Sequence, residues 1–381
     1  MKVGVYSMHI VDAVGMNVYH RNLINALVHL YPTLELQVLT TARRAARNQD
    51  SLYKDFNIPF VRKFFHESML GPLFRSLMRR VNGIALRKLA PQFDIIHATD
   101  PCHIPMGRIH NLVTTVHDII PIQLGLKETK ASRTRAFEKS FHFILKNSQL
   151  IFAPSYSVLN DIVEYAPSAR DRIRVTFEAA GPEFKPTAPH EKIFSKYGIP
   201  REAPFFLYVG SLNPRKNVLG LIEAFSLLPA DIRKRFRLLL ISGPREKIQE
   251  MAKRYSVQNY VHSWVGVTDE ELASLYSQAF ALTYVSLVEG FGLPILEAMQ
   301  CGCPVITSNC SSMAEVAGDA AILVDPHDVE SIRDGMLQLI EKPDLRKSLI
   351  QRGFQRAKEF SWERTAQETY EGYQVVVSGR V

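Results

Sequence analysis

The stretch EGFGLPILE, Glu289 to Glu297, places two carboxylates eight residues apart, with two glycines and a proline between them. Apolar residues precede and follow it, a pattern that predicts a strand, a glycine turn and a helix. Proline is favoured at the first position of a helix, so we expect the helix to begin at Pro294. Because the unpaired N–H groups of a helix N-terminus attract anions, the stretch predicts a phosphate-binding unit of an α/β fold.

The two glutamates of this stretch have different expected roles. Glu297 falls in the first helical turn, where its carboxylate could accept two hydrogen bonds from a vicinal diol such as a ribose. Glu289 precedes the turn, on the side where a sugar attached to the phosphate would lie. The alternative is an ordinary strand, turn and helix whose acidic residue merely suits the helix dipole.

The length, composition and net charge limit the class of protein to which the chain can belong. A chain of 381 residues, 46% hydrophobic and 22% charged, is long enough for two globular domains. The net charge of +8 favours an anionic partner such as a sugar nucleotide, a phospholipid surface or a nucleic acid. We expect no nucleic-acid partner, because the sequence has no RNA-binding, zinc-finger or helix-turn-helix signature.

Targeting signals and cysteine spacing point to the cytoplasm. The sequence MKVGVYSMHI lacks the apolar core of a signal peptide, and the longest uncharged run is short for a bilayer span. Cys102, Cys301, Cys303 and Cys310 lack the paired spacing of a zinc site. They are expected to be free thiols in a reducing compartment.

The first half of the chain begins as a doubly wound sheet does. A strand over 2–6, a loop containing Gly15 and a helical pattern to Leu30 form a strand–loop–helix unit. Gly15 could admit a phosphate or a sugar, although the loop is not a G-x-G-x-x-G fingerprint. Residues 61–90 combine seven basic residues with one acid and a helically spaced apolar stripe. They predict a basic amphipathic helix that binds anionic lipid, or else an ordinary surface helix.

Two expected strands of the first half end in ionisable residues. The strand over 93–97 ends in HATD, and the strand over 112–116 is followed by His117 and Asp118. Ligands of open α/β sheets bind beyond the carboxyl ends of the strands, so His117 and Asp118 are site candidates. A structural histidine remains the alternative for His117. His97, Asp100 and His103 are weaker candidates.

The second half repeats the alternation. The strand over 205–209 is followed by GSLNPRKN, where Arg215 and Lys216 are placed to neutralise a diphosphate, although they could be a solvated pair. A nucleotide base is expected against Ser242, Gly243 and the end of the strand at Val265. The proline-rich segment from Gly181 predicts a linker. We expect domains at 1–182 and 183–362, and a last helix in 363–381 packing back on the first domain.

Together these stretches carry a family resemblance over nearly the whole length. The chain resembles the retaining glycosyltransferases of family four, which have the GT-B fold: two Rossmann-like, doubly wound α/β domains facing across a cleft. The resemblance rests on YVGSLNPRKN, EGFGLPILE, EAMQCGCPVITSN and EVAGDAAILVDP, and on the Gly15 loop, DIIHATD and TVHDIIP. The first half looks like that of mannosyltransferases and rhamnosyltransferases of polysaccharide or glycolipid assembly.

The resemblance implies roles for these residues. Glu297 would hold the donor ribose, and Glu289 would contact the hydroxyls of the donor sugar. Arg215 and Lys216 would hold the diphosphate and stabilise it as a leaving group. His117 would lie near the transferred sugar and the acceptor, with Asp118 beside it. The remaining donor-binding positions that it implies are the backbone of Gly290, Phe291, Gly292 and Leu293, together with Gly15 and Ser211, the last standing where many relatives have arginine.

The expected reaction is transfer of a hexose, with mannose favoured, from a nucleoside diphosphate sugar to a glycan or lipid-linked acceptor with retention. No Asp-x-Asp is present, so we expect no metal requirement and no cofactor. The expected place is the cytoplasm, and the basic segment 61–90 suggests the inner face of the cell membrane within it. The alternatives are another GT-B enzyme, such as a sugar-nucleotide epimerase or a glycogen-type phosphorylase, and a non-catalytic membrane-surface protein built on 61–90.

Overall fold

The computed structural model describes residues 1–6, 16–41, 60–64, 72–99, 109–124, 131–188, 196 and 203–379. Gly15, Asp100 and His103 lie outside these residues. The chain forms two compact units: unit 1 comprises Met1–Glu178 and Ser361–Val381, and unit 2 comprises Ala179–Phe360. The chain thus crosses between units at 178/179 and again at 360/361, a few residues before the domain limits that the sequence suggests.

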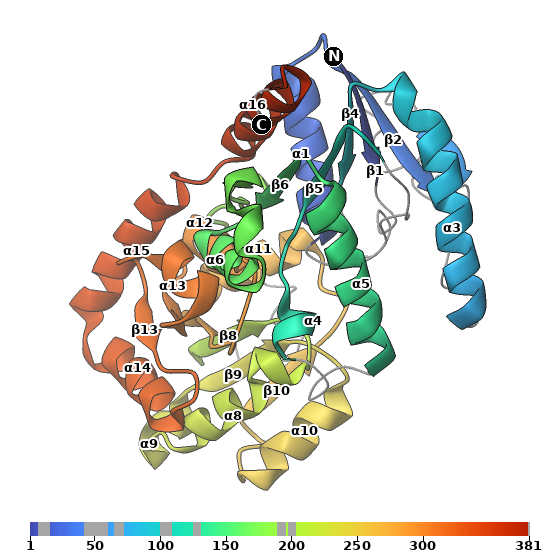
Figure 1. Ribbon diagram of the computed structural model, residues 1–381. Coiled ribbons are helices and arrows are strands. Elements are labelled where there is room, and N and C mark those ends of the chain that lie inside the picture. Colours follow the sequence, from blue (N-terminus) through green and yellow to red (C-terminus); the bar gives the residue numbers. More distant parts are fainter. Residues whose placement is uncertain are drawn as a thin grey trace. The chain divides into compact units, whose positions relative to one another are not determined.

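Unit 1 is built on a parallel sheet of seven strands in the order β3-β2-β1-β4-β5-β6-β7 (Figure 1). Its central strands are fully buried, as parallel strands between helices are. The strands are β1 Lys2–Tyr6, β2 Glu35–Thr41, β3 Phe60–Phe64, β4 Ile95–Ala98, β5 Leu112–Thr115, β6 Leu150–Ala153 and β7 Ile173–Val175. The helices are α1 Met16–Leu30, α3 Pro72–Leu89, η2 Ala90–Gln92, α4 Ile120–Gln123, α5 Ala131–Asn147, α6 Tyr156–Tyr165, η5 Pro167–Arg172 and α16 Trp362–Val377.

Unit 2 repeats this plan with a parallel sheet of six strands in the order β10-β9-β8-β11-β12-β13. The strands are β8 Phe205–Val209, β9 Arg237–Ile241, β10 Val261–Trp264, β11 Ala281–Tyr284, β12 Val305–Ser308 and β13 Ile322–Val324. The helices are η6 Pro214–Lys216, α8 Val218–Ser226, α9 Ala230–Arg235, α10 Arg245–Arg254, α11 Asp269–Gln278, α12 Leu293–Gln300, α13 Ser311–Ala317, α14 Val329–Glu341 and α15 Pro343–Ala357. The predicted doubly wound α/β class is confirmed in both units.

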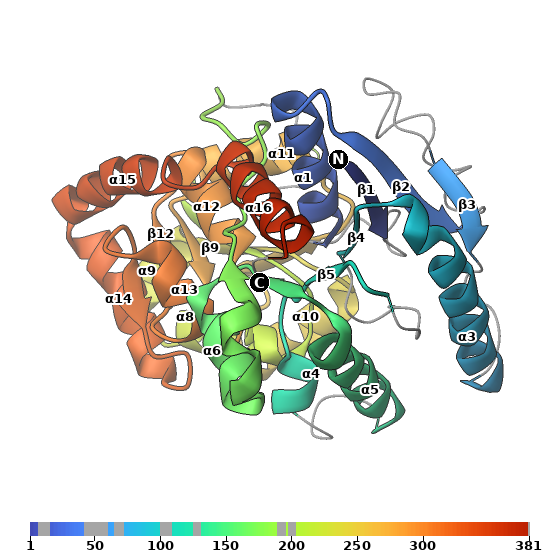
Figure 2. The same ribbon diagram turned by 45° about the horizontal axis from the view of Figure 1, so that its top comes forward.

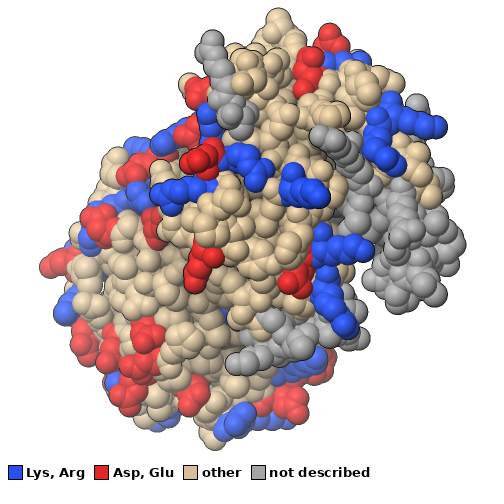
Figure 3. All heavy atoms as spheres, viewed as in Figure 1, with Lys and Arg blue, Asp and Glu red and all other residues tan. Residues whose placement is uncertain are grey.

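The segment 61–90 is only partly the helix that its periodicity predicts. Residues up to Phe64 belong to the edge strand β3, and the helix α3 starts at Pro72. Figure 3 shows basic side chains at the surface over the end of α3, where Arg87 and Lys88 are exposed. Among the described residues, no helix has the length and apolar character to cross a bilayer.

The last helix, α16, is remote in sequence from the rest of unit 1 but lies beside α1 in both ribbon views (Figures 1 and 2). The rings of Tyr31 and Tyr370 stack with their centroids 3.8 Å apart. Gly372 faces the sheet: a Cβ there would lie 2.6 Å from Phe152 Cζ and 2.8 Å from Leu150 Cδ2. The absence of a side chain at 372 therefore allows α16 to pack closely against β6.

We expect Gly372→Ala to destabilise unit 1 by about 1–3 kcal/mol, because an added methyl must displace core side chains. Urea unfolding monitored by circular dichroism measures the change. The matched control is Gly353→Ala in α15, where the nearest contact of a Cβ is the flexible Met299 side chain at 3.2 Å. Equal unfolding midpoints for Gly372→Ala and the wild type would contradict the close-packing argument.

Candidate functional site

The helix after the glycine turn begins one residue earlier than expected. α12 starts at Leu293, Pro294 is its second residue, and Gly292 is the N-cap with φ 113°. A φ in this range is strained for any side chain, which explains the glycine. Gly290, Phe291 and the buried Leu293 thus form the turn and helix start that the sequence assigns to donor binding.

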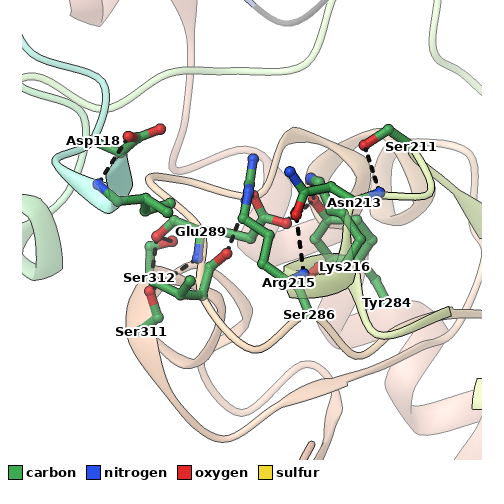
Figure 4. A network of polar contacts seen from close by, with 12 residues as sticks. Asp118, Ser211, Asn213, Arg215, Lys216, Tyr284, Ser286, Glu289, Ser311 and Ser312 are labelled. Atoms are coloured by element: carbon green, nitrogen blue, oxygen red, sulfur yellow. Dashed lines mark hydrogen bonds and ion pairs between the residues drawn. The ribbon is translucent and has the colours of Figure 1, made fainter. Parts of the chain in front are cut away.

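The Glu289 side chain is buried and held by two cations (Figure 4). Its Oε2 lies 2.6 Å from Arg215 Nη1, and its Oε1 lies 2.6 Å from Lys216 Nζ. The Tyr284 hydroxyl donates to Oε1 at 2.9 Å. Burial raises the pKa of Glu289, but Lys216 and then Arg215 outweigh burial and hold the pKa below its ordinary value. Glu289 is therefore a carboxylate at neutral pH.

The backbone of Glu289 is fixed by the start of α13. Ser311 Oγ and Ser312 Oγ donate to the Glu289 carbonyl at 2.7 and 2.9 Å, and the Glu289 N–H donates to Ser311 Oγ at 3.2 Å (Figure 4). Both serines belong to the phrase SSMAEVAG, for which the sequence alone predicts no part in the site. Hydroxyl residues at the start of the helix that follows the strand β12 are the signal that could have found them.

The Arg215–Lys216 loop is joined to the Glu289 loop. Asn213 caps the short helix η6 by accepting from the Arg215 N–H at 3.1 Å. Arg215 Nη1 donates to the Val288 carbonyl at 2.9 Å, and the Leu287 N–H donates to the Arg215 carbonyl at 2.7 Å. These loops follow the neighbouring strands β8 and β11, so the parallel sheet brings Arg215, Lys216 and Glu289 together at its carboxyl edge.

Ser211 lies in the same loop and is exposed. Its carbonyl accepts from the Tyr208 hydroxyl at 3.1 Å, which fixes the backbone where the chain leaves β8. Gly210 has φ 157°, and a Cβ there would lie 2.6 Å from the Tyr208 hydroxyl oxygen. The tyrosine therefore fills the space that a side chain at 210 would occupy.

Glu297 is buried without a cation partner among the contacts described. Its Oε2 accepts a hydrogen bond of 2.9 Å from the Tyr276 hydroxyl on α11. The start of α11 is fixed by a capping box between Thr268 and Glu271. Burial raises the pKa of Glu297 to about 7, and the Tyr276 bond opposes that rise. Glu297 is therefore poised to change charge near neutral pH.

Gly243 and Val265 follow the neighbouring strands β9 and β10. A Cβ at Gly243 would lie 2.4 Å from Val265 Cγ1, so this side chain occupies the space beside the glycine. Val265 is 68% exposed. The pair thus forms a small apolar surface at the carboxyl edge of the unit 2 sheet, with the buried Ser242 beside it.

In unit 1, His117 follows β5 and is 13% exposed at its side chain. Its Nδ1 lies 3.0 Å from Glu178 Oε1, and its Nε2 lies 3.1 Å from the Thr99 carbonyl oxygen. The Tyr19 ring meets it edge-on, with the centroids 4.7 Å apart. Burial lowers the pKa of His117, but the hydrogen bond and charge of Glu178 outweigh burial and raise it above its ordinary value.

Asp118 and His97 have structural contacts within unit 1. Asp118 Oδ1 accepts from the Ile120 N–H at 3.1 Å, at the start of α4. His97 is fully buried, with Nδ1 2.6 Å from the Tyr373 hydroxyl and Nε2 2.8 Å from Thr115 Oγ1. Burial lowers the pKa of His97 to about 3, so it is a neutral structural histidine and not a ligand contact.

In unit 1, Glu178 is a further site residue that the sequence did not reveal. It follows β7, so the rule that singled out His117, an ionisable residue just beyond a strand end, could have found it. Within the described part of the chain, no three His, Cys, Asp or Glu side chains form a group that could hold a metal ion. The cationic groups at the unit 2 site are Arg215 and Lys216.

Two family models match the chain. Residues 14–177 match the model described as Glycosyltransferase Family 4, and residues 189–356 match the model described as Glycosyl transferases group 1. The O-antigen chain mannosyltransferase B of Escherichia coli is 35% identical over 316 residues, which are 81% of each chain. A serotype-specific mannosyltransferase, WbdA, of the same organism is 32% identical over 68% of this chain but only 33% of its own length.

Solved structures share the fold. Sucrose-phosphate synthase from Thermosynechococcus elongatus superposes with a TM-score of 0.77 at 20% identity, covering 99% of both chains. WaaG, a glycosyltransferase involved in lipopolysaccharide biosynthesis, superposes with a TM-score of 0.76 at 17% identity over 98% of this chain and 99% of its own. With the two family models and the mannosyltransferase relative, these likenesses show that the chain belongs to the family 4 glycosyltransferases of the GT-B fold.

Proposed function

We propose that the protein transfers mannose from a nucleoside diphosphate mannose to a glycan or lipid-linked acceptor in polysaccharide biosynthesis. The names of the Escherichia coli relatives support mannose as the sugar and an O-antigen chain as the kind of acceptor. The site of unit 2 supports a nucleoside diphosphate donor. One strand–turn–helix unit carries a helix N-terminus and two buried carboxylates, and two cations of the neighbouring loop contact one of these carboxylates. Cations and a helix N-terminus suit a diphosphate, and carboxylates suit hydroxyl groups.

The observation that carries this proposal is the contact of Glu289 with Arg215 and Lys216. A departing diphosphate develops negative charge, which fixed cations stabilise. Arginine and lysine have five and three N–H donors, so each could bind a phosphate oxygen while still donating to Glu289. The same cations could do the work of a metal ion, and we propose that the reaction needs none.

We propose further that the sugar is transferred with retention by a front-face route, in which the leaving phosphate oxygen accepts the proton of the acceptor. Glu289 is engaged by two cations and a tyrosine, which makes it a poor nucleophile in this arrangement. Its expected role is to orient the donor sugar. Mass-spectrometric capture of a glycosyl–enzyme intermediate on Glu289 would rule out this route.

We place the reaction in the cytoplasm, at the membrane surface. The described cysteines Cys301, Cys303 and Cys310 are free thiols, as suits a reducing compartment. The exposed Arg87 and Lys88 of α3 offer positive charge to anionic lipid. Flotation with vesicles containing anionic lipid tests the surface contact, and vesicles of neutral lipid are the control. Equal flotation with both, or none with either, would contradict it.

Calorimetry with a panel of sugar nucleotides (GDP-mannose, UDP-glucose, UDP-N-acetylglucosamine and dTDP-rhamnose) tests the donor site. We expect tight binding of a mannose nucleotide by the wild type and its loss in Glu297→Ala. Tyr276→Phe, measured well above pH 7, is the matched control, because it removes the hydroxyl that contacts Glu297 but keeps the carboxylate. Binding of no panel member by a folded protein would contradict the proposed function.

Donor affinity should depend on pH through Glu297, whose pKa is about 7. A carboxylate accepts hydrogen bonds from both hydroxyls of a ribose, whereas a protonated carboxyl must lose its proton first. We therefore expect affinity to fall about tenfold per pH unit below about 7 and to level off above it. Tyr276→Phe should move this dependence to higher pH, because its hydrogen bond lowers the pKa of Glu297. The same pH dependence in Glu297→Gln would contradict this assignment.

A further inference from the structure

We propose that Glu178 is a positioning residue that holds His117 as an imidazolium, so that His117 acts as a fixed positive charge and not as a proton acceptor. The protonation state follows from contacts within unit 1 alone. The part of His117 in the reaction rests on the proposed function.

Both ring nitrogens of His117 face acceptors. Nε2 lies 3.1 Å from the Thr99 carbonyl oxygen, which has no proton to give, so Nε2 must carry a hydrogen to make this bond. Nδ1 lies 3.0 Å from Glu178 Oε1. When Glu178 is ionised, Nδ1 must also carry a hydrogen, and the ring is then doubly protonated.

The shared proton belongs on the ring. A carboxyl group ordinarily has a lower pKa than an imidazole, so in a contact pair the proton resides on the imidazole. Glu178 is only 6% exposed, and a buried carboxylate is stable when it is paired with a cation and hydrogen-bonded. The imidazolium of His117 provides both the charge and the hydrogen bond. The opposite arrangement would leave a neutral carboxylic acid donating to a neutral ring.

Two of the described groups near His117, Tyr19 and His97, add no positive charge beside it. On α1, burial raises the pKa of Tyr19, which therefore stays neutral, and His20 Nδ1 lies 3.0 Å from Thr99 Oγ1. On β4, His97 is neutral because burial lowers its pKa to about 3. Asp118, the next residue in the chain, adds negative charge that also favours the imidazolium.

The contacts of His117 with Glu178 and with the Thr99 carbonyl connect the ends of three strands. His117 follows β5, Thr99 follows the neighbouring β4, and Glu178 follows β7, which lies beyond β6 in the sheet. Glu178 is also the last residue of unit 1 before the chain enters unit 2. The preceding residue, Phe177, accepts a hydrogen bond at its carbonyl from Thr365 Oγ1, close to the second crossing. Protonated His117 thus anchors the segment at which the chain leaves unit 1.

This protonation state changes the part that His117 can play in the reaction. With both N–H groups engaged inside unit 1, neither nitrogen can take a proton from an acceptor hydroxyl. What the ring presents to a substrate is its positive charge and its polarised C–H edge. A negatively charged leaving group or a sugar oxygen suits such a surface, which agrees with a route in which the leaving phosphate accepts the proton.

Histidine nitrogen and carbon chemical shifts measured by NMR over pH 5.5–8.5 test the protonation state in the full-length protein. His117→Gln identifies the His117 signals among those of the 12 histidines. We expect the wild-type signals to be those of a doubly protonated ring at pH 7. Glu178→Gln should shift the titration to lower pH and give a neutral ring at pH 8. A neutral His117 in the wild type at pH 7 would overturn the proposal.

Kinetics separate this role from simple structural support. We expect Glu178→Gln to approach wild-type kcat only below the lowered pKa of His117 and to lose activity about tenfold per pH unit above it. Glu178→Asp should restore part of the alkaline range, and the exposed Glu164→Gln of α6 is the charge control. An equal loss for Glu178→Gln at all pH values would mean structural support only. If no mannosyl transfer is found, the proposed function fails while the NMR result still decides the protonation state.

Discussion

Lys216→Ala should lower kcat by about 10²–10³-fold, the usual loss when one group that stabilises a developing negative charge is removed. Lys216 Nζ lies 2.6 Å from Glu289 Oε1 and 2.8 Å from the Tyr284 hydroxyl, so its ammonium is fixed before the donor arrives. Its side chain is 14% exposed, and Coulomb interactions are stronger there than in bulk water. The loss should appear mainly in kcat, because the charge on the diphosphate grows as the bond to the sugar breaks.

Single-turnover measurement of mannosyl transfer under donor saturation measures this effect. Lys347→Ala is the matched control: Lys347 lies on α15 in the same unit, and its side chain is 77% exposed. Lys216→Arg keeps the positive charge and should retain more activity than Lys216→Ala. If Lys216→Ala kept wild-type kcat and raised only KM, Lys216 would bind donor and leaving group equally, and its assignment to the leaving-group charge would be wrong.

The sequence predicted the elements that bear on this site because they depend on local patterns. Apolar runs separated by glycine and proline turns marked most strands of both sheets, and residues after a strand end were correctly expected at the carboxyl edge. The contact of Lys216 and Arg215 with Glu289 follows from the adjacency of β8 and β11. This strand order is typical of doubly wound sheets, so the resemblance to a family with such sheets predicts it.

Partners that depend on tertiary packing could not be predicted in this way. Glu178 is 61 residues from His117 in sequence, and their contact requires β7 to lie two strands from β5. The hydroxyls of Tyr276 and Tyr284 each donate a hydrogen bond to a site glutamate. In the sequence, however, they read only as apolar members of a helix and a strand, respectively. No periodicity distinguishes a tyrosine whose hydroxyl has a buried partner from one that merely fills space.

Helix starts show the same limit on a smaller scale. Statistical preference places proline first in a helix, so Pro294 was expected to begin α12. The structure begins the helix at Leu293 because Gly292, with φ 113°, makes the turn directly before it. Glu297 is therefore the fifth helical residue and not a member of the first turn. Its burial beside Tyr276, rather than the helix dipole, governs its pKa.

Glu289→Ala should destabilise unit 2 by about 3–5 kcal/mol, the range for removing one partner of a buried ion pair. The substitution leaves Arg215 and Lys216 facing each other without the carboxylate between them, and their side chains are only 21% and 14% exposed. The pKa of Glu289 is lowered in the folded state, so its stabilising contribution is present above its ordinary value near 4.5 and is lost as pH falls through the lowered pKa. Urea unfolding at pH 7 measures the destabilisation by Glu289→Ala. The same measurement at pH 4 measures how much of the stabilising contribution of Glu289 is lost in acid.

A nucleoside diphosphate should restore more stability to Glu289→Ala than it adds to the wild type. In the variant its phosphates would replace the missing negative charge between the two cations, and binding to the folded state alone stabilises by mass action. Glu289→Gln is the control, because it keeps the volume and the hydrogen-bond acceptor but removes the charge. Equal stabilisation of wild type and Glu289→Ala by the nucleotide would mean that the diphosphate binds away from Arg215 and Lys216. Preferential rescue of the variant would identify these cations as the diphosphate site independently of any rate measurement.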